Sequence, residues 1–122
     1  MEIINFYKGF EREPKIELVQ MNKQGNIKKI LELWIGYFDE IVEKIKPNEN
    51  GQWEGVPLFY HTETGWYDDE NWKCSDLILF YEQLRQIKDN IYDEKVKKIY
   101  SELIMTVDNC VINQDDLYFR YK

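Results

Sequence analysis

The sequence predicts a single, mainly helical (α+β) domain: a small bundle of about three amphipathic helices with a minor β-hairpin or a few short strands. Two observations carry this prediction. Three stretches place apolar residues at the i, i+3, i+4, i+7 spacing of a helix with one buried face, and short links join the stretches, which favours a bundle. The length of 122 residues allows one domain, residues 1–122, to bury a core without disulfides or metal.

The first predicted helix covers residues 26–45. Its apolar face comprises eight residues at helical spacing: Ile27, Ile30, Leu31, Trp34, Phe38, Ile41, Val42 and Ile45. Gly25 marks its start, and Pro47 marks its end because a proline pushes the preceding residue out of the helical region. Lys44 and Lys46 in the last turn would suit the helix dipole.

Two further helices are predicted in the second half of the chain. The second begins near Ser75 and Asp76, a cap and a first-turn acid, and ends around residues 88–90. Its buried face comprises Leu77, Phe80, Tyr81, Leu84 and Ile87. The third has Asp93 as its N-cap. Its buried face comprises Val96, Ile99, Tyr100, Leu103, Val107, Cys110 and Val111.

Three shorter segments are candidates for β-structure. Residues 15–21 fit either a short strand or a helical turn with Pro14 at its first position. Residues 56–61 and 66–68 could pair as a small hairpin that turns over residues 62–65. Residues 117–121 alternate after a turn-forming cluster and are expected to add a strand.

One segment, Pro47–Trp72, carries nearly all of the net charge of the chain. It contains six carboxylates and six aromatic residues but no Lys or Arg. Outside it, 17 acids face 16 bases, so the net charge of −7 arises almost entirely from this acidic window. Aromatic side chains supply contact area at low entropic cost, and clustered carboxylates steer a cationic partner. The window therefore predicts a surface that binds a basic partner, although Trp53, Trp66 and Trp72 could instead close the open end of the bundle.

Composition argues against several classes of partner and location. The isoelectric point of about 4.8 argues against binding to nucleic acid or to an anionic membrane. The densest basic cluster, Lys95, Lys97 and Lys98, is typical of a solvated helix face. A cytoplasmic, soluble protein is expected, because the N-terminus lacks the pattern of a secretory signal and no stretch of about 18 apolar residues occurs.

The motifs of common enzymes and metal sites are also missing. Cys74 and Cys110 are far apart and lack a CxxC partner, so no zinc site or redox pair is predicted. The only histidine, His61, precedes Thr62 and Glu63 and matches only half of a zinc deaminase signature. The glycines form no phosphate-binding pattern. We expect no cofactor, no metal and no enzymatic activity; a small hydrolase using His61 with Glu63 or Glu54 is an alternative.

A small, acidic domain rich in Trp and Tyr, with no catalytic constellation, resembles the immunity proteins of bacterial contact-dependent growth inhibition and other polymorphic toxin systems. The segment from Trp53 to Trp72 and the helices around it carry the resemblance. It rests on the overall composition of the chain and not on a specific motif. It implies an antitoxin that binds and neutralises a cognate toxin domain, a basic nuclease, and blocks its active site or its access to substrate. Immunity folds are diverse, so the resemblance implies no fold.

The residues predicted to bind this partner are acidic and aromatic residues of the window, together with its histidine: Trp53, Glu54, Tyr60, His61, Glu63, Trp66, Tyr67, Asp68, Asp69 and Glu70. Two alternatives remain open. One is a phage-type decoy that mimics DNA to block a nuclease, which would favour carboxylates spread over the surface at phosphate-like spacing. The other is a structural or regulatory module with no toxin involved.

Overall fold

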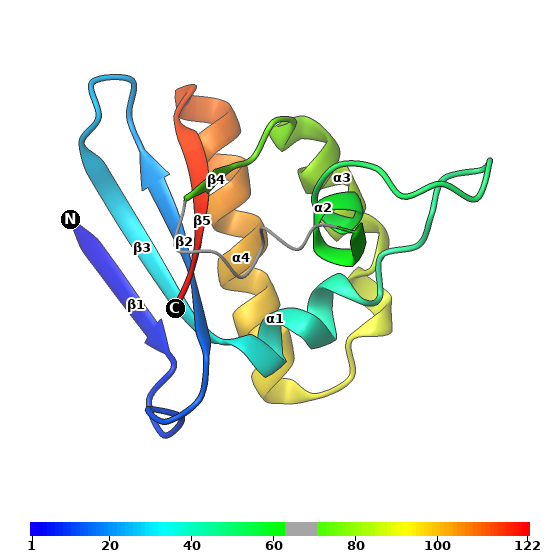
Figure 1. The fold of residues 1–122 in the computed structure, drawn as a ribbon, viewed down its shortest axis with the longest axis horizontal. Coiled ribbons are helices and arrows are strands. Elements are labelled where there is room, and N and C mark those ends of the chain that lie inside the picture. The colour runs from blue at the N-terminus through cyan, green and yellow to red at the C-terminus, as the bar shows by residue number, and fades with distance from the viewer. Residues whose placement is uncertain (63–70) are drawn as a thin grey trace.

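The computed structural model describes residues 1–62 and 71–122 and shows a mixed α/β fold, so the predicted three-helix bundle is wrong (Figure 1). These ranges contain a five-stranded sheet, four α-helices and one short 3-10 helix. The elements in chain order are β1 (Glu2–Phe6), β2 (Lys15–Met21), β3 (Ile27–Trp34), α1 (Ile35–Val42), α2 (Val56–Thr62), β4 (Trp72–Lys73), α3 (Leu77–Gln86), η2 (Lys88–Asn90), α4 (Glu94–Asn113) and β5 (Asp116–Tyr121).

The sheet has the strand order β1-β3-β2-β5-β4. β1 runs parallel to β3, and all other neighbours are antiparallel. Leu18 in the central strand β2 lies opposite Leu31 of β3 on one side and Phe119 of β5 on the other. The first and last thirds of the chain therefore meet in the middle of the sheet.

The helices all lie on one side of the sheet, and α4 runs along the strands (Figure 1). The core between these layers contains alternate strand residues, as expected for a sheet with one covered face. The largest fully buried side chains include Ile16, Leu18, Leu31, Leu33 and Leu117 from the strands and Phe38, Phe80, Leu84, Ile99 and Leu103 from the helices.

The face of the sheet away from the helices carries an ion-pair network around Glu17. Its carboxylate is nearly buried although it is charged, and three cations approach it, Arg120 at 3.1 Å, Lys122 at 3.5 Å and Lys15 at 3.6 Å. Lys15 also contacts Glu32 at 3.2 Å. Glu17 thus replaces lost hydration with neighbouring positive charge, as a buried carboxylate must.

The predicted helix over residues 26–45 is half wrong, because β3 occupies its first part and α1 begins only at Ile35. β3 lies between two strands, and Ile30, Leu31 and Leu33 are all buried although neighbouring side chains point to opposite faces. Ile30 is buried on the outer face beside the charged Glu32, so the apolar residues of β3 do not alternate strictly and mimic a helical pattern.

The boundary signals of that predicted helix also have other roles. Gly25 has a φ of +86° in the turn between β2 and β3, a conformation that favours glycine. α1 ends at Val42, well before Pro47. Lys44 and Lys46 therefore follow the helix and do not lie in its last turn.

The predicted hairpin is also wrong in the part that is described, because residues 56–62 form helix α2. Pro57 lies in the first turn, where its missing N–H would have no intrahelical partner in any case. Val56 and Pro57 are buried there. The proposed second strand, residues 66–68, and the turn from residue 63 lie outside the described residues.

The second and third predicted helices and the C-terminal strand are confirmed, although Asp76 and not Ser75 is the cap of α3, and of the two alternatives for residues 15–21 the strand is correct. Asp76 caps α3 by accepting a hydrogen bond from the Leu79 N–H at 3.0 Å, and Asp93 caps α4 through the N–H groups of Lys95 and Val96. Residues 15–21 form strand β2, and the C-terminal segment forms β5.

Candidate functional site

The described part of the acidic window folds against α1 and brings carboxylates and aromatic rings together. The Tyr60 hydroxyl of α2 donates a hydrogen bond to Asp39 Oδ1 of α1 at 2.6 Å and a longer one to Glu43 Oε1 at 3.3 Å. The Tyr60 ring packs edge-on against the buried Phe38. We call the following five residues the acidic aromatic surface: Asp39, Glu43, Trp53, Tyr60 and His61.

The loop between α1 and α2 brings Trp53 against His61. Within it, the Asn48 side-chain oxygen accepts a hydrogen bond from the Gln52 N–H at 3.0 Å, closing a turn in the way that asparagine commonly does. The Trp53 indole stacks on the His61 ring with centroids 4.2 Å apart and planes 28° apart. His61 also meets the Tyr60 ring edge-on at 5.0 Å. The aromatic part of the surface is therefore a connected row of three rings.

The two carboxylates of this surface accept hydrogen bonds from the same hydroxyl group. Burial raises the pKa of the Asp39 carboxyl, the hydrogen bond from Tyr60 opposes this effect, and the negative charge of Glu43 adds to the rise. Burial and the same carboxylates raise the pKa of the Tyr60 hydroxyl, so it remains a proton donor. No ion pair of residues 1–62 and 71–122 involves Asp39 or Glu43.

The structure brings three of the predicted partner-binding residues together and turns a fourth elsewhere. Trp53, Tyr60 and His61 form the row of rings, whereas the Glu54 carboxylate accepts a hydrogen bond from Asn48 at 2.9 Å. Six predicted residues lie outside the described residues: Glu63, Trp66, Tyr67, Asp68, Asp69 and Glu70. Their roles stay predictions.

The sequence did not indicate Asp39 and Glu43, because both lie outside the acidic window. The available signal was their spacing. They are four residues apart, which places two like charges on one helix face at a small energetic cost. What the spacing does not show is that Tyr60, 21 positions after Asp39, reaches both of them.

Trp72 supports the alternative that some aromatics of the window complete the core. It is half-buried, packs against the core cluster and stacks on Phe59 with centroids 4.2 Å apart and planes 9° apart. It also contacts Phe119 of the neighbouring strand. Trp53 is also half-buried, but it is not among the described residues packed against the core cluster, and its stacking partner His61 is exposed. Trp72 thus belongs to the fold, and Trp53 belongs to the surface.

The geometry around His61 offers little to the hydrolase alternative. Its ring contacts are Trp53 and Tyr60. Within the described ranges, no hydrogen bond or ion pair joins His61 to a carboxylate, and Glu54, one of its two suggested partners, is bound to Asn48. The other, Glu63, lies outside those ranges. A general base needs an orienting partner and a substrate within reach, and no such partner for His61 is seen here.

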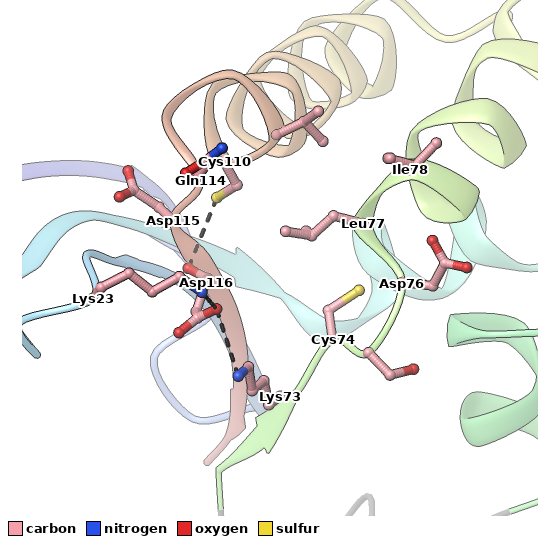
Figure 2. A pocket seen from close by; sticks show the side chains of 12 residues that line it. Lys23, Lys73, Cys74, Asp76, Leu77, Ile78, Cys110, Gln114, Asp115 and Asp116 are labelled. Carbon is pink, nitrogen blue, oxygen red and sulfur yellow. Dashed lines mark hydrogen bonds and ion pairs between the residues drawn. The ribbon is translucent and has the colours of Figure 1, made fainter.

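A separate pocket of about 440 Å³ lies where β4, α3, α4 and β5 meet (Figure 2). Both cysteines line it, Cys74 from the end of β4 and Cys110 from α4. Burial raises the pKa of the Cys74 thiol to about 11 and that of the Cys110 thiol to about 12. Both are therefore protonated at neutral pH, which disfavours a nucleophilic or metal-binding role.

The charged groups of this pocket neutralise one another. Asp116 accepts a hydrogen bond from Lys23 at 2.7 Å and lies 3.5 Å from Lys73, as Figure 2 shows. Asp115 is buried and accepts hydrogen bonds from Lys28 at 2.7 Å and from Gln20 at 2.8 Å. These contacts join the β2–β3 turn to β4 and β5, so we interpret the cluster as structural.

No group of three or more His, Cys, Asp or Glu side chains in the described residues could hold a metal ion. No helix in the same residues is long and apolar enough to cross a bilayer. Comparison with protein families, with characterised proteins and with solved structures finds no significant match to this chain. The case for a function therefore depends on the geometry above and on the sequence.

Proposed function

We propose that this chain is an immunity protein that binds and neutralises a basic toxin domain, with a nuclease domain as the expected class, and that the acidic aromatic surface contributes to the contact. The observation that carries the proposal is the carboxylate pair of Asp39 and Glu43. The Tyr60 hydroxyl holds both, and neither forms an ion pair within the described residues. The Tyr60 hydrogen bonds offset only part of the cost of placing two carboxylates together, as the raised pKa of Asp39 indicates, whereas a basic partner would supply the missing charge.

The neighbouring rings provide the second component of a binding surface. Trp53 and His61 stack next to the carboxylates and are at least partly open to solvent. A lysine or arginine of a partner could therefore contact carboxylate oxygens and an aromatic face together. Large aromatic side chains at the centre of an interface typically contribute most of its binding energy.

The sequence extends the same chemistry beyond these residues. Asp68, Asp69 and Glu70 add three carboxylates, and Trp66 and Tyr67 add two rings. A nuclease must present a basic cleft to hold phosphate, and a carboxylate-rich surface can occupy such a cleft, with association speeded by charge steering. The proposal places the protein in the cytoplasm, where such a toxin would act.

The experiment first looks for a toxin gene beside this one, then co-expresses the chain with the C-terminal domain of that toxin and measures growth and binding. We expect the chain to restore growth and to bind that domain. The double variant Asp39→Asn/Glu43→Gln should slow association and flatten its dependence on salt. The matched control is Glu2→Gln/Glu94→Gln, which removes the same charge from exposed positions on β1 and α4.

Further variants separate anchoring from steering. Replacing Trp66 and Tyr67 by Ala should raise the dissociation rate, whereas neutralising Asp68, Asp69 and Glu70 should lower the association rate. Equal kinetics for all variants, or the lack of a toxin gene beside this one, would overturn the proposal. Inhibition of several unrelated DNA-binding proteins would instead support the DNA-mimic alternative.

A further inference from the structure

A groove between α3, η2 and α4 collects positive charge on a chain whose net charge is −7. It consists of two adjoining pockets of about 370 and 520 Å³ that share Lys88, Tyr100 and Ser101. The shared residues place the two hollows side by side, and we treat them together as one groove. Arg85 extends it along α3, and Lys97 extends it along α4.

The charges that line this groove are unbalanced. Arg85, Lys88 and Lys97 face one acid, Asp89. Arg85 and Lys97 each pair with a glutamate on their own helix, at 3.4 and 3.3 Å, but all four side chains are about half exposed or more, and such pairs contribute little. Within residues 1–62 and 71–122, Lys88 has no ion pair.

Three tyrosines line the groove, and one of them, Tyr100, is held in place by burial and a hydrogen bond. Tyr100 is buried and its hydroxyl donates a hydrogen bond to the Leu84 carbonyl at 2.6 Å, which fixes α3 against α4. Tyr81 lines the groove beside it. Tyr92 also lines the groove and is 79% exposed, although tyrosine side chains are usually at least partly buried. These rings offer flat apolar area between the cations.

We propose that this groove binds an acidic, extended segment of a partner protein. Carboxylates at intervals along such a segment would meet Arg85, Lys88 and Lys97, and its apolar side chains would lie on Tyr81 and Tyr92. The cations are distributed along the length of the groove, which suits a series of carboxylates. The groove shares no residue with the acidic aromatic surface, so the proposal is independent of the toxin.

The test uses the full chain and a fluorescently labelled synthetic peptide of alternating glutamate and leucine, measured by anisotropy. We expect saturable binding that weakens with salt. Lys88→Glu should weaken it by about tenfold, because one favourable charge becomes repulsive. The matched control, Lys98→Glu, makes the same charge change at an exposed position on α4 that does not line the groove and should leave affinity within about twofold. Lys88→Gln, with a smaller loss expected, is the second variant should the charge reversal not fold.

Three results would overturn the proposal. Equal losses for the Lys88 and Lys98 variants would show non-specific attraction. Tight binding of a nucleotide with no binding of the peptide would assign the groove to a small anion. Dimerisation of the chain that Lys88→Glu abolishes, measured by sedimentation, would show that a second copy is the occupant. Saturable binding of the peptide with the Lys88-specific loss would support the proposal.

Discussion

The Trp34 indole lies directly over Gly36, so that a Cβ atom added to Gly36 would fall 2.4 Å from the ring. The same indole stacks on Phe10 with centroids 4.3 Å apart and planes 5° apart, and it meets Tyr37 edge-on. The ring is therefore held on both sides and has little room to retreat. This contact lies where the chain passes from β3 to α1.

Gly36→Ala should destabilise the protein by about 1–2 kcal/mol, because the new methyl group must displace the stacked indole. The direction of the change in the free energy of unfolding tests the contact with Trp34. In a helix, glycine-to-alanine replacement normally stabilises by up to about 1 kcal/mol. Chemical denaturation monitored by circular dichroism measures the difference.

The control is the same replacement in a Trp34→Leu background. Without the indole, Gly36→Ala should be neutral or stabilising, since only the helix propensity remains. A loss of equal size in both backgrounds would show that the strain arises from another neighbour.

Asp39→Asn should stabilise the fold at pH 7 by about 1 kcal/mol or less, because it removes a partly buried charge and keeps an oxygen that can accept the Tyr60 hydrogen bond. The sign follows from the raised pKa of Asp39. The folded state binds this proton more tightly than the unfolded state, so the ionised carboxylate opposes folding. The gain from the variant should shrink as the pH falls toward the ordinary value of 3.8.

The same variant links stability to the proposed function. If Asp39 is kept for a basic partner, Asp39→Asn should bind that partner less well while melting at a higher temperature. Tyr60→Phe provides the comparison, because it removes the shared donor and should lower the melting temperature. A higher melting temperature with unchanged binding would separate Asp39 from the interface.

Acid should weaken the cluster that joins the β2–β3 turn to β4 and β5. The hydrogen bond from Lys23 is the main cause that lowers the pKa of Asp116. For Asp115, burial would raise the pKa, but hydrogen bonds from Lys28 and Gln20 outweigh it and lower the pKa. Carboxyls with lowered pKa values stabilise the fold above their unfolded value of 3.8, and this contribution is lost as the pH falls through the folded values.

Asp116→Asn should therefore cost about 1 kcal/mol or less at pH 6, because the lysines are exposed and solvent screens them. The difference from the unmodified chain should disappear well below pH 3.8. Thermal unfolding of both proteins across this pH range measures it. A cost that is the same at every pH would assign the effect to packing and not to charge.

The sequence was most informative where a local signal decides the structure. The cap signals place α3 to within one residue, since Asp76 and not the predicted Ser75 is its cap, and Asp93 places α4, because a capping carboxylate satisfies backbone N–H groups within its own helix. β3 was not predictable in this way. Its apolar residues serve two faces of a central strand, and only the strands on either side, from distant parts of the chain, distinguish it from a helix.

In the candidate site, too, some features are visible in the sequence and others arise only from packing. The acidity and aromatic content of the window are visible in composition, and so are Trp53, Tyr60 and His61. The carboxylates that Tyr60 holds come from α1 and its C-cap, outside the window, and the basic groove combines Arg85 of α3, Lys88 of η2 and Lys97 of α4. Such groupings arise from packing, which residue order does not reveal.

Cys74 and Cys110 should resist thiol reagents in the folded protein. Their side chains are buried, and burial raises their pKa values to about 11 and about 12. At pH 8 very little thiolate is present, and the thiolate is the reacting species. We expect slow labelling by a disulfide reagent under native conditions, with Cys74 reacting before Cys110, and rapid labelling of both in guanidinium. Single Cys→Ser variants assign each rate. Fast native labelling of Cys110 would mean that α4 and β5 separate readily, and would contradict the burial of Cys110 between them.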